Sequence, residues 1–215
     1  MSTSETIPPG PGTPACVVGA MTERDVAGVL ALQRRYLRGA RPPGEEARDG
    51  FLTLQHDAPT LERMAASAPQ VVAHAGAPGR EGGEHVVAYA LTLVPTLRGS
   101  FPLLAPMFAL LDGLDWRGAP LAAQPYYVMG QVCVDAGYRG VGLFDRLYAA
   151  HRALLGERFS LCVTEVAARN ARSLAAHARV GFEVAGAHDD ALTGEAWRVL
   201  VWDWRGDPAS GGPGE

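Results

Sequence analysis

Two apolar runs, each followed by a helical pattern, constrain the fold of this chain most strongly between residues 128 and 182. The first run is short and rich in β-branched residues (Val128, Val132, Val134), and Gly137 ends it. Helical spacing then takes over, with apolar residues at Leu143, Leu147, Ala150 and Leu154. The order predicts a buried strand, a glycine-bearing turn, an amphipathic helix, a second buried strand and a second helix.

The turn before the first of these helices reads Arg139-Gly140-Val141-Gly142. A glycine-bearing turn that opens a helix directs several backbone N–H groups at one point, with the positive end of the helix dipole behind them. Such a turn suits a phosphate or pyrophosphate, although glycines before a helix can also be turn residues alone. A phosphate loop is excluded because Leu143-Phe144 replaces Lys-Ser/Thr, and the three-glycine dinucleotide fingerprint is absent.

Further motifs follow at fixed order: a strand that ends in Glu165-Val166, then Asn170-x-x-Ser173, then Gly181-Phe182. Together with Arg139-x-x-Gly142 they resemble the acyl-CoA core of the GNAT superfamily (GCN5-related N-acetyltransferases). The resemblance implies an α/β (α+β) fold: a mixed, mostly antiparallel central sheet of about six or seven strands, flanked by about four helices. It also implies an enzyme that moves an acetyl or other acyl group from acetyl-CoA to an amine, by direct attack in a ternary complex and without a metal.

In this resemblance the turn amides hold the CoA pyrophosphate and the strand before them bonds the pantetheine. The implied cofactor-binding residues are Cys133, Val134, Arg139, Gly140, Val141, Gly142, Leu143, Phe144, Asn170, Ser173 and His177. Two positions depart from the family pattern. Phe144 stands where Gly or Ala is usual, and its ring must turn into the core to leave the amide accessible. His177 stands where many members carry a tyrosine near the CoA sulfur.

Transfer to an amine requires a base, because an alkyl ammonium with a pKa of ~10.4 is mostly protonated at pH 7. Glu165 is the candidate, since it alternates with Leu161 and Val163 on a strand where an unpaired carboxylate is unfavourable. It also matches the glutamate that family members acting on protein N-termini are thought to use. The alternatives are a salt bridge with Arg169 or Arg172, or a strand end that reaches solvent.

His177 is the candidate acid for the leaving thiolate, and the alternative is a half-buried helical histidine that only touches the cofactor. A backbone N–H near Val134 is expected to polarise the thioester carbonyl. Asn170 either bonds the pantetheine or caps its helix. Cys133 lacks an identifiable base partner for nucleophilic catalysis. The remaining histidines show no metal-ligand spacing (His56, His74, His85, His151, His188).

Composition fits a cytoplasmic protein with one domain over residues 15–205, between disordered tails at 1–14 and 206–215. Its 215 residues are 47% hydrophobic, carry a net charge of −4 and include three cysteines. These values argue against nucleic-acid binding and a disulfide framework, and no run is long enough to span a membrane. The expected partner is a small-molecule or peptide amine, with a homodimer as an option. The alternative function is a CoA-binding regulatory protein on the same scaffold with little turnover.

Outside this core the patterns predict strands at 15–20, 70–75 and 86–94, with a turn at 76–83 between the last two. They predict helices from Thr22 and around 61–66, and closing strands at 182–188 and 197–204, the last inside the sheet because both of its faces are apolar. Residues 97–125 form an apolar insertion with a tryptophan. It either covers the acceptor pocket, or fills an edge of the core or a dimer contact.

Overall fold

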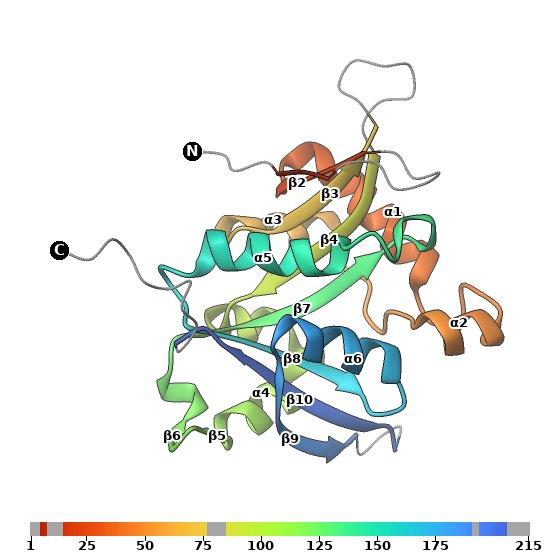
Figure 1. Ribbon diagram of the computed structural model, residues 1–215. Coiled ribbons are helices and arrows are strands. Elements are labelled where there is room, and N and C mark those ends of the chain that lie inside the picture. Colours follow the sequence, from red (N-terminus) through yellow and green to blue (C-terminus); the bar gives the residue numbers. More distant parts are fainter. Residues whose placement is uncertain (1–4, 8–14, 77–84, 191–193, 206–215) are drawn as a thin grey trace. The chain divides into compact units, whose positions relative to one another are not determined.

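The computed structural model of the protein describes residues 5–7, 15–76, 85–190 and 194–205 (Figure 1). The chain divides into two compact units. Unit 1 comprises residues 1–92 and 129–154, and unit 2 comprises residues 93–128 and 155–215. The single domain predicted for residues 15–205 therefore stays a prediction. The rest of the predicted tails and the turn over 77–83 lie outside the described residues.

The strands of unit 1 follow the order β1, β2, β3, β4 and then the unit 1 part of β7 (Tyr126–Val134). Strands β1 (Glu5–Ile7), β2 (Cys16–Ala20), β3 (Val71–Ala75) and β4 (His85–Leu93) are antiparallel to their neighbours. The bounds of β2, β3 and β4 agree with the predicted strands to within one residue at each end. Strand β1 corrects the prediction of disorder throughout residues 1–14, because its backbone pairs with β2.

Four helices belong to unit 1: α1 (Val26–Tyr36), α2 (Pro43–Asp49), α3 (Ala58–Ser67) and α5 (Leu143–Leu155). Helix α1 begins as predicted near Thr22, which forms a capping box with Asp25. Helix α2 was not predicted. Helices α1 and α5 cover opposite faces of β4. Helix α1 contacts the network around Tyr89 that is described below, whereas α5 bonds Thr92 through His151. Side chains alternate along a strand, so Tyr89 and Thr92 lie on opposite faces of β4.

A buried network of polar side chains ties the strands of unit 1 to α1. Oε1 of Gln131 on β7 accepts hydrogen bonds from Gln33 Nε2 (2.9 Å) and Tyr89 Oη (2.7 Å), and Gln131 Nε2 donates to the Leu54 carbonyl at 2.7 Å. Gln33 Oε1 accepts from the backbone N–H of His56 at 2.9 Å. The network fixes the segment after α2 against β7, because each buried polar atom in it depends on the others for its hydrogen bonds.

Unit 2 contains the first three residues of β7, which pair in parallel with β8 (Leu161–Ala167). Strand β10 (Ala196–Asp203) lies between β8 and β9 (Glu183–Asp189) and is antiparallel to both. The position predicted for the last strand, inside the sheet, is therefore confirmed. The mixed, mostly antiparallel α/β fold is confirmed as well, with β1 and α2 as additions to the elements expected and with α4 (Ala105–Asp112) in the apolar insertion.

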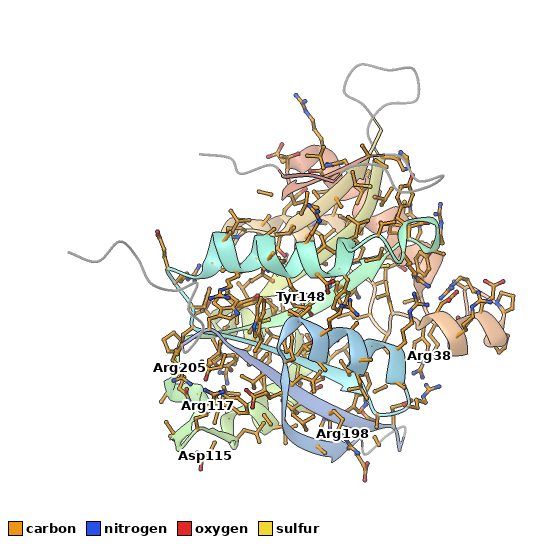
Figure 2. The ribbon with its side chains drawn as sticks, viewed as in Figure 1. Arg38, Asp115, Arg117, Tyr148, Arg198 and Arg205 are labelled. Atoms are coloured by element: carbon orange, nitrogen blue, oxygen red, sulfur yellow. The ribbon has the colours of Figure 1, made fainter. Side chains whose placement is uncertain are left out.

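The insertion over residues 97–125 belongs to the core of unit 2. It forms α4, a short hairpin of β5 (Asp115–Trp116) with β6 (Ala119–Pro120), and 3-10 turns. Its large apolar side chains Phe108, Leu111 and Trp116 are buried, and Trp116 Nε1 donates to Asp203 Oδ2 at 2.9 Å. Arg117 and Arg205 bind the same carboxylate (Figure 2). This part of the insertion fills the core, which is one of the alternatives given by the sequence analysis.

Helix α6 (Ala171–Val180) packs on one face of β8 and β10 in unit 2 (Figure 1). Phe182, just after the helix, stacks on Trp202, which belongs to a group of rings with Trp204 and Tyr127. Trp202 is the partner of Cys162 across the strands, so α6 covers the face that carries Cys162 and Thr164. Among the described helices, none combines the length and the apolar character that crossing a membrane requires.

Removing the Gln70 side chain tests how far unit 1 depends on buried polar contacts. Gln70 Nε2 donates to three carbonyls, and its Oε1 accepts from the Thr92 N–H at 2.7 Å. We expect Gln70→Leu to lower the free energy of unfolding by about 2–4 kcal/mol, because buried backbone groups lose their partners. Urea unfolding measures this. Gln55→Leu, at an exposed position, is the matched control, and equal losses in the two variants would contradict the prediction.

Candidate functional site

The loop between β7 and α5 contains the glycine turn for which the sequence predicts an anion site. Gly140 and Gly142 have left-handed backbone, with φ of 79° and 80°, which glycine adopts without strain. The N–H groups of residues 140–143 donate to no acceptor within the part of the chain that the structure describes. A Cβ added at either glycine would meet no atom within 4 Å. Unpartnered donors and open space beside both glycines therefore occur together at the start of a 13-residue helix.

Contacts on both sides of these glycines hold the loop in place. The Asp135 carboxylate accepts the Gly137 N–H at 3.1 Å, and the Ala136 N–H donates to Tyr36 Oη at 2.6 Å. Arg139 Nε donates to the Val134 carbonyl at 3.0 Å, and its guanidinium lies over the Tyr36 ring. Arg139 was expected among the cofactor contacts, which stays a prediction, and in the structure its side chain anchors the loop to the end of β7.

A cluster of arginines surrounds one carboxylate beside this loop. Asp49, the last residue of α2, lies 3.2 Å from Arg139, 3.4 Å from Arg41 and 2.9 Å from Arg48. The hydrogen bond from Arg48, together with the charges of Arg139 and Arg41, lowers the pKa of Asp49 to about 2. Three guanidinium groups thus share one negative charge, and the excess positive charge favours an anion at the neighbouring amides.

Phe144 departs from the family pattern without filling the loop. Its ring packs on Tyr148, one turn further along α5, with ring centroids 5.1 Å apart. Tyr148 is itself fully buried, and the adjacent Leu143 side chain is buried too. The direction of the ring matches the expectation that it turns toward the core, so Phe144 brings its backbone to the loop while its side chain joins the packing of α5.

The end of β7 supplies the backbone expected to meet the acyl group. The Asp135 N–H donates to the Val87 carbonyl of β4 at 2.8 Å. Because N–H groups alternate along a strand, the Val134 N–H faces the opposite edge from β4. Burial raises the pKa of the Cys133 thiol to about 12. Cys133 therefore stays a neutral thiol at pH 7, in agreement with its exclusion as a nucleophile.

In unit 2, three predicted residues meet at the start of α6. Asn170 is the N-cap, and its Oδ1 accepts the Ser173 N–H at 3.0 Å. His177, one turn on, donates from Nδ1 to the Ser173 carbonyl at 2.8 Å. Burial lowers the pKa of His177 to about 4, so the ring is neutral at pH 7 and its one proton is bound to that carbonyl. The acid role of His177 stays a prediction, and this pKa weighs against it.

Glu165 has a partner that the sequence did not reveal. His188 Nε2 on β9 lies 3.1 Å from Glu165 Oε1 on β8, and both side chains are largely buried. Arg169, one of the two partners considered for Glu165, pairs with Glu195 at 2.6 Å instead. Desolvation raises the pKa of Glu165, and the charge and hydrogen bond of His188 oppose that rise. Glu165 and His177 lie on opposite faces of β8, because Glu165 alternates with Thr164.

The structure therefore groups the predicted residues within each unit. In unit 1 it brings together the end of β7 and the glycine loop, and in unit 2 it brings together Asn170, Ser173 and His177. Sequence reasoning missed Asp49 and His188. The start of α2 could have been predicted from the sequence, since Pro43 stands at the first helical position with Glu45 and Glu46 in the first turn. In the described part of the chain, no group of three or more His, Cys, Asp or Glu side chains is placed to hold a metal ion.

Comparison with solved structures identifies the fold. The architecture is that of GNAT acetyltransferases, which is the fold the sequence resemblance implied. No family model matches the sequence, and no curated protein sequence matches it either.

The individual structures are distant in sequence but nearly complete in coverage. One is the NatC complex bound to Gag peptide and CoA, with a TM-score of 0.58 and 14% identity over 87% of this chain and 98% of that chain. Another is the ribosomal-protein-S18-alanine N-acetyltransferase from Escherichia coli, at 0.54 and 12% over 87% and 93%. A third is an acetyltransferase of the GNAT family from Streptococcus pneumoniae, at 0.54 and 13% over 86% and 97%.

The buried state of His177 predicts a pH dependence of stability. The pKa of this histidine falls from ~6.5 in the unfolded chain to about 4 in the folded protein. Its contribution to stability is therefore complete above pH 6.5 and is lost as the pH falls toward 4. Between pH 7 and pH 5, the wild-type protein should lose about 2 kcal/mol more of its free energy of unfolding than His177→Gln.

Urea unfolding at the two pH values measures this difference. His85→Gln removes an exposed imidazole and serves as the control, with the pH dependence of the wild type. A His177→Gln variant with an unchanged pH dependence would show that the buried ring titrates normally.

Proposed function

We propose that this chain is an acyl-CoA-dependent N-acyltransferase that moves an acetyl group from acetyl-CoA to the amine of a small molecule or peptide. The single observation that carries the proposal is the row of unpartnered amides at residues 140–143 in front of α5. Consecutive unpartnered amides at the start of a helix suit the pyrophosphate of CoA. The positive charge around Asp49 adds to the attraction.

Backbone groups of unit 1 are proposed to hold the donor. The amides of Gly140, Val141, Gly142, Leu143 and Phe144 bind the pyrophosphate, and the backbone of β7 at Cys133 and Val134 bonds the pantetheine. The Val134 N–H stabilises the negative charge that develops on the thioester oxygen during attack. Contacts of Asn170, Ser173 and His177 with the cofactor remain predictions from the resemblance.

Glu165 is proposed as the general base. It takes a proton from the acceptor ammonium, and the amine nitrogen then attacks the thioester carbonyl carbon. A carbon–nitrogen bond forms, the carbon–sulfur bond breaks, and the sulfur leaves as the thiolate of CoA. The nitrogen, which still carries one surplus proton after attack, loses it to solvent, and solvent protonates the thiolate. Burial supports this role, because a desolvated carboxylate with a raised pKa accepts a proton more readily than an exposed one.

The relatives in fold suggest an acceptor class. One of them is bound to a Gag peptide, and another is named for the alanine of a ribosomal protein. A screen of peptides and small amines for acetyl-CoA-dependent gain of mass identifies the acceptor of this chain. Binding of CoA without transfer to any amine would favour the alternative, a regulatory CoA-binding protein.

Alanine substitution in the glycine loop tests the pyrophosphate site. We expect Gly140→Ala and Gly142→Ala each to weaken CoA binding by about tenfold or more, because a methyl group enters the space that the phosphates need. Isothermal titration calorimetry with CoA measures the affinity. Gly39→Ala is the matched control, since Gly39 also has positive φ (83°) and open space around its Cβ position. If Gly140→Ala and Gly142→Ala bound CoA as tightly as the control Gly39→Ala, this site would be ruled out.

Replacing the base separates chemistry from binding. We expect Glu165→Gln to lower kcat by about 100-fold or more while the Kd for CoA stays unchanged, because the amide cannot accept the ammonium proton. Steady-state thiol release with the identified acceptor gives kcat, and calorimetry gives the Kd. Glu183→Gln removes an exposed carboxylate from the same unit and should retain full activity. Wild-type turnover in Glu165→Gln would remove Glu165 from the mechanism.

A further inference from the structure

The pairing of β9 with β10 contains an irregularity that determines where His188 lies. Glu183 pairs with Val201 and Val184 pairs with Leu200, but Val199 pairs with Gly186, so Ala185 is an extra residue. Such a bulge moves all later side chains of the strand to the opposite face. Without it, His188 would lie on the α6 face of unit 2. With it, His188 lies opposite Trp197, on the same face as Glu165.

Glu165 and His188 meet above the central strand of this sheet. Glu165 is the partner of Val199 on β10, and His188 is the partner of Trp197, two residues away on the same face. The side chains bridge β10, with His188 Nε2 at 3.1 Å from Glu165 Oε1. Glu165 is 15% exposed and His188 is 26% exposed. Val199, beneath the contact, is fully buried, so a low-polarity surface underlies the pair.

We propose that His188 is the positioning residue of the base: its Nε2–H donates to Glu165 Oε1 and holds the carboxylate so that Oε2 receives the acceptor proton. This inference rests on the proposed N-acyltransferase function. In the step, the ammonium N–H bond breaks and an Oε2–H bond forms, while His188 keeps its own proton. The neutral carboxylic acid then returns its proton to solvent after the thiolate has left.

Among the described residues near Glu165, His188 is the ionisable side chain with a hydrogen bond to its carboxylate. On β8 and β10 the neighbours on this face are Ala167, Trp197 and Val199, all uncharged, and on β9 the neighbour is Gly186 with Leu114 against it. Asp189 and Arg198 alternate onto the other face. The nearby acids Glu183 and Glu195 are engaged by Arg117 and Arg169. The effect of His188 on Glu165 can therefore be measured with little interference.

Titration of Glu165 in the free protein provides a test that needs no activity. Carbon-13 NMR of the side-chain carboxyl, assigned by loss of its signal in Glu165→Gln, reports the pKa directly. Because burial raises this pKa and His188 lowers it, we expect His188→Ala to move the Glu165 titration to higher pH. His188→Gln, whose amide can still donate to Oε1, should move it less.

Arg198→Gln is the matched control, because it removes a charge from β10 on the opposite face. It should leave the Glu165 titration where it is in the wild type. Circular dichroism confirms that each variant is folded. An unchanged Glu165 titration in both His188 variants, or an equal shift in Arg198→Gln, would overturn the proposed pairing.

The pH profile of kcat/KM then tests the catalytic part. The acidic limb should move to higher pH in His188→Ala by the same amount as the NMR titration, with partial restoration in His188→Gln and no change in Arg198→Gln. KM for acetyl-CoA should stay constant. A merely structural role would lower activity evenly and leave the limb in place. If the wild type transfers no acyl group, the function fails while the NMR result for the pair stands.

Discussion

Several backbone N–H groups can converge on one point only where the chain takes conformations that side chains normally forbid, and two glycines of left-handed φ meet that requirement between Arg139 and Leu143. The loop keeps this form because its neighbours are anchored. Tyr36 accepts the Ala136 N–H, and Arg139 bonds the Val134 carbonyl. The conformation of the loop is thereby fixed by contacts within the protein.

The same anchoring engages the side chain of the arginine in the motif. The Arg139 guanidinium is used by the end of β7, by Asp49 and by the Tyr36 ring. Its charge still contributes to the field at the amides, since electrostatic attraction acts over several ångströms. In this loop, the main chain provides directional contacts, whereas the arginine cluster provides charge.

The order of elements in the core could be predicted because periodicity and glycine position report on it directly. The strand–loop–helix at residues 126–155 and the capped helix after Asn170 are examples. Side-chain partners could not be predicted in the same way. Whether Arg169 pairs with Glu165 or with Glu195 depends on the register of β8 with β10, and one sequence does not contain that register.

The degree of burial of a side chain could not be predicted from the sequence pattern either. His177 occupies a helical position that reads as half-buried, yet it is almost inaccessible, with its ring 5.0 Å from that of Phe182. The consequence is chemical, because a desolvated imidazole stays neutral where an exposed one is partly charged. The sequence placed His177 on its helix, but it could not give the protonation state of the ring.

The extra residue at Ala185 has an evolutionary consequence. Loss of one residue between Glu183 and Ala187 would restore regular pairing and keep the imidazole at position 188 opposite Trp197, beside the glutamate of β8. Regular pairing in a strand of unchanged length would instead send this imidazole to the other side of the sheet. The register of β9 against β10, and not only the presence of a histidine, thus distinguishes chains with this carboxylate–imidazole pair from those without it.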